Sequence, residues 1–228
     1  MIINKATGSN LSTELTKHFW MPLGIDNVYI SQEEPIPDNQ AHVYGDNFQF
    51  GDSNLDVTFM PRASHESITY GSSGIFITSE NLARWSHALF EGKILRQQSM
   101  DQMLQFIEFK PAANMRAYGL GVQVYDRKFS YGKEAIGHGG GNIGTTAYMV
   151  YLPKYHVSIV VMINAFPNEG ADVITRGLIR VVLKELKAFG IIPYFEFFPT
   201  GFIILCISIS LLTLLISYIM KRKKLLQA

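Results

Sequence analysis

Hydrophobic and polar positions recur with two different periods along this chain, and the change of period divides it into segments. Near the N-terminus, Leu11, Leu15 and Phe19 have helical spacing, which predicts an amphipathic helix over 11–20 that ends before Pro22 and Gly24. The stretch 31–62 is rich in Pro, Asp, Asn, Gln and Gly. It predicts long loops with a short strand near 41–44, and loops of this length are typical of functional or lid-like segments.

Two further helices are predicted in the middle of the chain. The first has an apolar stripe of Leu82, Trp85 and Leu89, with Ser79 as the expected N-cap, Glu80 in the first turn and Gly92 as the stop. The second is expected to begin at Ser99, because Ser99 and Gln102 have the spacing of a capping box. Its inward-facing residues are expected to be Met103, Leu104 and Ile107.

The period then changes to that of strands. The ranges 119–125, 134–138, 145–152 and 156–164 alternate or run apolar between turn residues, which predicts an antiparallel meander. A last soluble helix is predicted over 171–186, and the residues expected to pack on the sheet are Ile174, Leu178, Val181, Val182 and Leu186. The pattern therefore predicts an α+β fold, an antiparallel sheet flanked by helices.

The C-terminal stretch predicts a transmembrane helix. Residues 197–220 carry no charge, and about 24 residues at ~1.5 Å each cross a ~30 Å hydrocarbon core. Aromatic residues precede the stretch, and the basic run Lys221–Lys224 follows it, which places that end in the cytoplasm and the body outside it. We expect a single-pass protein of the cell membrane with a domain over 1–190, a juxtamembrane linker at 191–196, the span at 197–220 and a cytoplasmic tail at 221–228.

Charge and cysteine content exclude several kinds of function. The formal net charge is +1, and the basic tail accounts for it, so nothing indicates a nucleic-acid partner. Cys206 is the single cysteine, which leaves no intramolecular disulfide and no cysteine metal site. The six histidines show no zinc-binding spacing, and we expect neither a metal nor a cofactor.

The stretch GHGGGNIG at 137–144 is the strongest candidate for chemistry. Glycine costs roughly 0.5–1 kcal/mol relative to alanine in an ordered element, so a run of glycines indicates a sharp turn or a close approach to the backbone. One interpretation is a glycine-rich hairpin with an incidental histidine. A second, the HGGG loop of α/β-hydrolase esterases, requires a G-x-S-x-G elbow that this chain lacks.

A third interpretation rests on several segments that occur in a fixed order. These are ATGSNLSTELTKHFWMPLGIDNVY, AHVYG, GSSGIFITSENLARWSHALFEGKIL and IGHGGGNIGTTAYMVYLPKYHVSIVVMINA. Their order and spacing resemble the C-terminal part of the beta-lactamase-related serine hydrolases, which include class C beta-lactamases, DD-peptidases and esterases of the same fold. In that resemblance His138-Gly139-Gly140 corresponds to the H-x-G form of the third family motif.

The resemblance implies roles for the glycine-histidine stretch. A substrate would lie along the edge of the motif strand like an added strand, with Gly139, Gly140 and Asn142 as substrate-binding residues. His138 and Gly141 would be the catalytic residues. His138 would hold a substrate carboxylate or the active-site hydroxyls, and the backbone N–H of Gly141 would be one of two oxyanion-hole donors.

The nucleophile that such a reaction needs is not apparent in the sequence. The single S-x-x-K spacing is Ser130 to Lys133, between two strands, where a polar turn explains it better than a helical serine-lysine pair. Ser79-Glu80-Asn81 mimics an S-x-N motif, but an N-cap explains it. There is no Y-x-N, and Tyr118 and Tyr148 are interpreted as core or rim residues. We therefore expect the nucleophile, its base and the N-terminal strands to belong to an upstream region.

Two functions follow from this reading. The first is part of a membrane-anchored serine hydrolase that forms an acyl-enzyme on an amide, ester, lactam or D-amino-acid peptide and is inactive as this chain alone. Its partners would be a small-molecule or peptidoglycan-like substrate, the membrane and the missing N-terminal half of the same domain. The alternative is a non-catalytic, membrane-anchored binding or partner protein. The sequence does not define the substrate.

Overall fold

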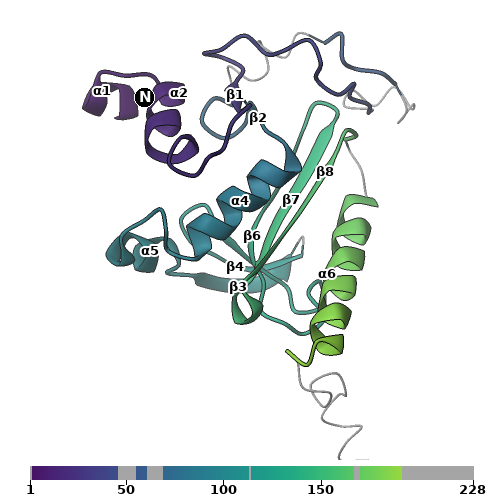
Figure 1. Cartoon of the computed structure of the whole chain (residues 1–228). Helices are drawn as coiled ribbons and strands as arrows, with labels where there is room; N and C mark the ends of the chain where they lie inside the picture. Colours follow the sequence, from purple (N-terminus) through teal and green to yellow (C-terminus); the bar gives the residue numbers. More distant parts are fainter. Residues whose placement is uncertain (1, 46–54, 61–68, 113, 167–169, 192–228) are drawn as a thin grey trace, which may run out of the picture. The chain divides into compact units, whose positions relative to one another are not determined.

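The computed structural model describes residues 2–45, 55–60, 69–112, 114–166 and 170–191. Its contacts divide the chain into two units, Met1–Arg180 and Val181–Ala228, which are treated separately. The strands and the helices before the last one lie in the first unit (Figure 1).

The N-terminal helical elements are α1 (Ile2–Thr7), α2 (Leu11–Leu15) and a π-helical turn (Thr16–Trp20). The helix predicted over 11–20 is thus confirmed, although its second half has the wider π-helical hydrogen-bond pattern. Asn10 caps α2, since its side chain accepts a hydrogen bond from the backbone N–H of Thr13. The rings of Phe19 and Trp20 meet the ring of Trp85 edge to face at centroid distances of 5.1 and 5.2 Å. This aromatic cluster joins the N-terminal helices to α4 (Ser79–Phe90).

Helix α4 was predicted correctly, but its N-cap was not. The N-cap is Thr78, whose hydroxyl accepts from the N–H of Asn81, whereas Ser79 is the first helical residue. The predicted stop is confirmed, because Gly92 follows the last turn with φ +70°. The next helix, α5 (Gln97–Met103), begins two residues before Ser99, without a side-chain cap. The capping-box prediction at Ser99 is therefore wrong.

The sheet is a six-stranded antiparallel meander in the order β3-β4-β5-β6-β7-β8. Its strands are β3 (Ile107–Ala112), β4 (Met115–Tyr118), β5 (Gln123–Tyr125), β6 (Ile136–Asn142), β7 (Thr145–Leu152) and β8 (Val157–Ile163). A separate two-stranded ladder joins β1 (Tyr29–Ile30) to β2 (Ile75–Phe76). The predicted meander and the α+β class are confirmed. Strands β3 and β4 were not predicted, and Ile107, expected to face inward, is 75% exposed on β3.

Helix α4 covers one face of the sheet. Ile136 of β6 and Tyr151 of β7 pair across the ladder and belong to one buried cluster, against which Phe90 of α4 packs. The rings of Phe90 and Tyr151 are stacked with centroids 5.0 Å apart. Because side chains alternate between the two faces of a strand, His138, Gly140 and Asn142 also face the α4 side.

The last helix, α6, spans Gly170–Ala188, close to the range predicted. Within the first unit its buried residues are Ala171, Thr175 and Ile179, whereas Ile174 and Leu178 are 49% and 41% exposed. The predicted apolar face is therefore wrong. The Thr175 hydroxyl can be buried on this face because it donates to the Ala171 carbonyl at 2.7 Å.

Among the described residues, no helix is both long and apolar enough to cross a membrane. The predicted span at 197–220 and tail at 221–228 lie outside the described residues, as does the predicted linker apart from Ile191. Of the second unit, the structure describes the end of α6 and the three residues that follow it.

Candidate active site

The five predicted site residues lie together in the second half of β6. The strand predicted over 134–138 corresponds to β6, which begins at Ile136 and continues without a break through Gly139, Gly140 and Gly141 to Asn142. The glycine run is therefore part of the sheet. This places the five residues on one extended segment, with alternate residues on alternate faces.

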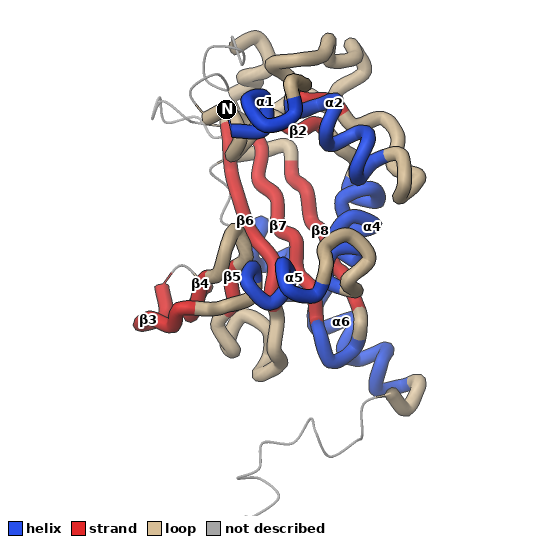
Figure 2. Tube along the Cα trace, turned by 90° about the vertical axis from the view of Figure 1, so that its left-hand side faces the viewer, coloured by secondary structure: helices blue, strands red, loops and turns tan. Residues whose placement is uncertain are grey.

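One edge of this segment is open among the described strands. Strand β7 pairs with β6 along its whole length, whereas β5 pairs only with Ile136 and Gly137. Figure 2 shows β6 and β7 running well past the short β5. From His138 onward, the backbone groups that point away from β7 therefore meet no strand on their other side. Such an edge can accept an added strand.

The glycines of β6 have different surroundings. A Cβ on Gly137 would lie 1.9 Å from the Met149 carbonyl oxygen, and one on Gly141 would lie 2.2 Å from the Phe166 ring. On Gly139 it would come within 3.0 Å of the Tyr148 ring. Packing against neighbours accounts for these three. Gly140 differs, because a Cβ there would meet nothing within 4 Å.

The face of Gly140 looks into a cavity of about 1250 Å³. Gly140, Asn142, Ala147 and Met162 of the three long strands line one side of it, and Trp85 of α4 lines another. The N-terminal helices and the turn before β2 also contribute to the lining, with Leu11, Leu15, Trp20, Tyr70, Ser72 and Ser73. The lining is mostly apolar with a few hydroxyl and amide groups, as in many ligand sites.

His138 faces the same side of the sheet and is exposed. Its Nε2 lies 2.9 Å from the hydroxyl oxygen of Tyr118, at the end of β4. The two rings meet edge to face, with centroids 5.8 Å apart. Tyr118 was expected to be a core or rim residue, and its contact with His138 was not predicted, because no local pattern links two residues twenty positions apart.

Ser130 occupies a turn, as the sequence indicated, and it is fully buried. Its hydroxyl donates to the carbonyl oxygens of Asp126 and Lys133. Tyr131 and Gly132 after it both have positive φ, so the segment is a tight turn and not a helix. A buried hydroxyl held by two carbonyls is poorly placed to attack a substrate.

The residues of the S-x-N mimic have structural partners. Ser79 is the exposed first residue of α4, and Asn81 is buried. The Asn81 side-chain amide donates to the backbone carbonyl of Asp26 at 2.8 Å. Asn81 thus fastens the chain before β1 to the start of α4.

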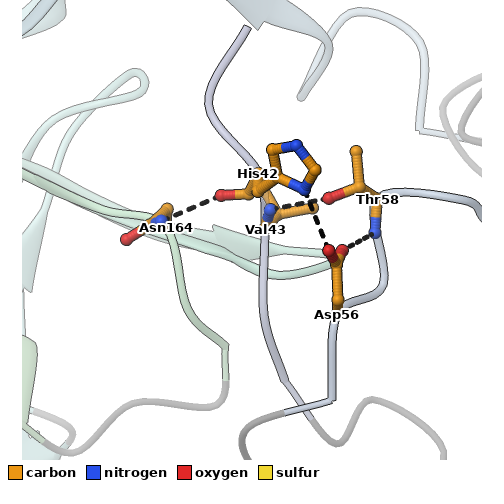
Figure 3. A network of polar contacts seen from close by, with 5 residues as sticks. All are labelled: His42, Val43, Asp56, Thr58 and Asn164. Carbon is orange, nitrogen blue, oxygen red and sulfur yellow. Dashed lines mark hydrogen bonds and ion pairs between the residues drawn. The ribbon is translucent and has the colours of Figure 1, made fainter.

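A polar network fastens the loop at 41–45 beside the end of β8 (Figure 3). The Asp56 carboxylate is 2.9 Å from His42 Nδ1 and accepts the Thr58 N–H at 2.9 Å. The Thr58 hydroxyl accepts the Val43 N–H, and the Asn164 side-chain amide donates to the His42 carbonyl. Hydrogen bonds from Thr58 and then His42 lower the pKa of the Asp56 carboxyl to about 2.

This network supports the hairpin that joins β6 to β7. Val43 and Val57 form a small buried cluster with Ile143 at the hairpin tip. Gly144 has φ +61°, and a Cβ there would lie 2.7 Å from the Val43 Cβ. The loop therefore fits the hairpin closely and fixes the end of the site strand.

On the opposite side of the cavity, a second carboxylate, that of Glu33, links α2 to the segment before β2. Glu33 accepts hydrogen bonds from the backbone N–H groups of Leu11 and Ser12, at 3.2 and 2.6 Å, and from the Tyr70 hydroxyl. It therefore caps α2 from outside the helix. Burial and then the hydrogen bond to Glu33 raise the pKa of Tyr70 to about 12, so this cavity-lining phenol stays neutral.

Comparison with known proteins shows that a single protein family matches the whole of the first unit. The beta-lactamase family model matches residues 1–184. The structure of a D-amino acid amidase from Ochrobactrum anthropi SV3, complexed with L-phenylalanine amide, has 22% identity and a TM-score of 0.69, over 82% of this chain and 55% of that one. A D-stereospecific amidohydrolase from Streptomyces sp. has 21% identity and a TM-score of 0.62, over 75% of this chain and 49% of that one.

A class C beta-lactamase also matches, with 17% identity and a TM-score of 0.52, over 79% of this chain and 54% of that one. At these identities the solved structures establish the fold. The chain spans about half the length of each of these proteins.

Proposed function

The chain belongs to the beta-lactamase family of serine hydrolases, and on this premise we propose that the second half of β6 is the substrate-binding wall of an acyl-enzyme hydrolase. The observation that carries the proposal is the open edge of β6 beside His138, where Gly140 faces the cavity. A substrate amide can add to this edge as an extra strand, with main-chain hydrogen bonds for affinity. A side chain at Gly140 would fill the space beside that edge.

Each site residue has a role in this proposal. His138 hydrogen-bonds the substrate or the attacking hydroxyl, and the backbone N–H of Gly141 donates to the oxyanion of the tetrahedral intermediate. One such donor is worth about 3 kcal/mol in other hydrolases. Gly139 and Asn142 belong to the substrate-binding wall.

We further propose that the nucleophile comes from outside these 228 residues, in the N-terminal half of the same domain. Ser130 is buried in a turn, and no other serine of the sequence has the S-x-x-K spacing. The cavity of about 1250 Å³ exceeds the roughly 300–1,000 Å³ of small-molecule sites. It therefore has room for a ligand beside Gly140. The chain alone would then bind substrate without turning it over.

Amides of D-amino acids are the substrates to test first. Two of the similar structures are described as a D-amino acid amidase and a D-stereospecific amidohydrolase. Esters, lactams and D-amino-acid peptides present the same kind of carbonyl to an oxyanion hole. Peptidoglycan-like peptides are the larger candidates.

For the C-terminal stretch we propose a single-pass anchor at 197–220, with residues 1–190 outside the cytoplasm. Its support is the uncharged sequence between aromatic residues and the basic run Lys221–Lys224. Protease added to intact cells should then digest the body and spare a tag placed after Ala228. Loss of the tag while the body stays intact would indicate the opposite orientation.

The binding proposal is tested by adding D- and L-phenylalanine amide to the full chain and following its amide resonances. We expect the D-amide to shift resonances of β6 more than the L-amide does. Gly140→Val should abolish the shifts, because its side chain enters the cavity. Gly177→Val on the exposed side of α6 is the matched control and should leave them unchanged. Equal shifts in the two variants would contradict the proposal.

A fluorophosphonate probe and a labelled beta-lactam test the location of the nucleophile. We expect no covalent adduct on the purified chain. An adduct mapped to a serine of these 228 residues would disprove the external nucleophile. The alternative function, a non-catalytic binding protein, is favoured by the absence of an S-x-x-K motif on a helix. It predicts ligand binding with no adduct even when the chain is labelled within intact cells.

A further inference from the structure

Tyr118 reaches the side chain of His138 from two strands away in the sheet. The distance between the Tyr118 hydroxyl oxygen and His138 Nε2 is 2.9 Å, and the rings cross at 76° with centroids 5.8 Å apart. Both a hydrogen bond and an edge-to-face ring contact therefore hold the imidazole.

The strand register brings the two residues close together along the sheet. Tyr118 ends β4 and pairs with Gln123, the first residue of β5, and Gln123 in turn pairs with Gly137. His138 is thus the first residue of β6 that lies past the ladder with β5. No described residue of β5 pairs with His138.

The turn after Tyr118 is held in place by α5. Gly119 lies so close to the Met103 carbonyl that a Cβ would come within 2.3 Å of its oxygen, and the Leu120 N–H donates to the same oxygen at 3.0 Å. A glycine at 119 allows this approach. The position of Tyr118 is therefore set by the end of α5.

From this geometry we infer that Tyr118 is a positioning residue that fixes the tautomer of His138. A phenol O–H is a better donor than an imidazole N–H, and a neutral imidazole nitrogen is a better acceptor than a phenol oxygen. The hydroxyl proton therefore stays on Tyr118, and Nε2 of His138 accepts a hydrogen bond from it. The single ring proton of neutral His138 must then lie on Nδ1.

This tautomer decides what His138 offers to a ligand. With Nε2 occupied, the free nitrogen is Nδ1–H, which is a donor and not a general base. It suits a substrate carbonyl or carboxylate oxygen. The consequence for catalysis rests on the proposed function, whereas the tautomer itself does not.

The test is a long-range ¹H–¹⁵N spectrum of the full chain, in which a protonated and an unprotonated ring nitrogen have distinct shifts. We expect His138 to show Nδ1 protonated at a pH where the ring is neutral. In Tyr118→Phe, which keeps the ring and removes the hydroxyl, we expect a mixture of tautomers with Nε2–H predominant. Tyr131→Phe, a hydroxyl deletion on an exposed turn residue, is the matched control and should leave His138 unchanged.

Two results would overturn the inference. One is an Nε2–H tautomer in the unaltered chain, which needs no variant to fold. The other is an unchanged Nδ1–H tautomer in Tyr118→Phe. In the assembled hydrolase, Tyr118→Phe should lower kcat/KM by about tenfold. A changed tautomer with unchanged kcat/KM would support the positioning role and contradict instead the catalytic role proposed for His138.

Discussion

At the scale of single residues, the glycines of β6 are retained for two different reasons. Gly137, Gly139 and Gly141 lie on the face opposite α4, where neighbours occupy the space of a Cβ. Gly140 lies on the α4 face, in front of the cavity, where no atom of the described chain is near. From the sequence, Gly139 and Gly140 were expected to bind substrate and Gly141 to donate to the oxyanion. Among these four glycines, Gly140 alone has no described neighbour at the position of a Cβ.

Alanine substitutions at 140 and 141 should therefore have opposite effects on stability. Gly140→Ala should raise the free energy of unfolding by about 0.5 kcal/mol, because alanine restricts the unfolded chain and meets no neighbour. Gly141→Ala should lower it by about 1–3 kcal/mol, because its Cβ overlaps the Phe166 ring. Urea unfolding of the full chain measures both.

The double variant Gly141→Ala/Phe166→Ala is the control for this mechanism. If the ring is the cause, the second substitution should recover part of the loss, as a coupling between the two sites. Strictly additive losses, or equal effects of the alanines at 140 and 141, would contradict it.

Asp56 should make the loop network sensitive to acid. Its pKa of about 2 in the folded chain lies below the ordinary value of 3.8, so the ionised carboxylate stabilises the folded state above about pH 4. This contribution is lost as the pH falls through about 2. Asp56→Asn should lower stability at neutral pH, and its difference from the unaltered chain should shrink toward pH 2 in a pH series of urea unfolding.

The groups that face this carboxylate are His42 and Thr58. Asp101→Asn on α5 removes the same charge outside the network and is the control. A difference between Asp56→Asn and the unaltered chain that stays constant across the series would argue against the proposed role of the charge.

At the scale of elements, the two adjacent hydroxyl residues at the start of α4 have different structural roles. Thr78 accepts the Asn81 N–H at 3.2 Å, whereas Ser79 is already helical. Thr78→Ala should cost about 1 kcal/mol of stability. Ser79→Ala, one residue further on, should change stability by less than about 0.5 kcal/mol. Thermal melts of the two variants check this, and a larger loss at Ser79 would refute it.

The elements differ in how far the sequence could predict them. The apolar residues of α4 recur at helical spacing, and strands β6 to β8 alternate or run apolar. Both patterns were recognised in the sequence. Strands β3 and β4 were missed because IEFKPAANMRAY mixes charges, a proline and short apolar runs. The buried face of α6 was assigned wrongly, since Ala171 and Thr175 are buried there and Leu178 is not.

The candidate site could be predicted from the sequence only in part. The glycine-histidine run was found because it is contiguous in the sequence. The partner of His138 was not, because its position depends on how short β5 is and on where α5 ends. Contacts that depend on the register of several strands leave no periodic signal in the sequence.

At the scale of the whole molecule, the two edges of the six-stranded sheet are unlike each other. Strand β3 carries Glu108, Lys110 and Pro111, which discourage pairing with another strand. Strand β8 has the sequence VSIVVMI, without a charge or a proline, and pairs only with β7 among the described strands. An edge of this kind is a template for further strands, and in the proposed hydrolase it would pair with the N-terminal half.

The chain alone should therefore self-associate through β8, and one charge should prevent it. Met162 of β8 lines the cavity and is 42% exposed, so Met162→Lys adds a solvated charge beside this edge without entering the buried core. Light scattering of the full chain in detergent should show a mass above that of one copy, and Met162→Lys should reduce it. Ile107→Lys, at a 75% exposed position on the opposite edge, is the matched control and should not. A similar reduction in both variants would indicate a general effect of charge on solubility, and a monomeric unaltered chain would show that β8 is already paired.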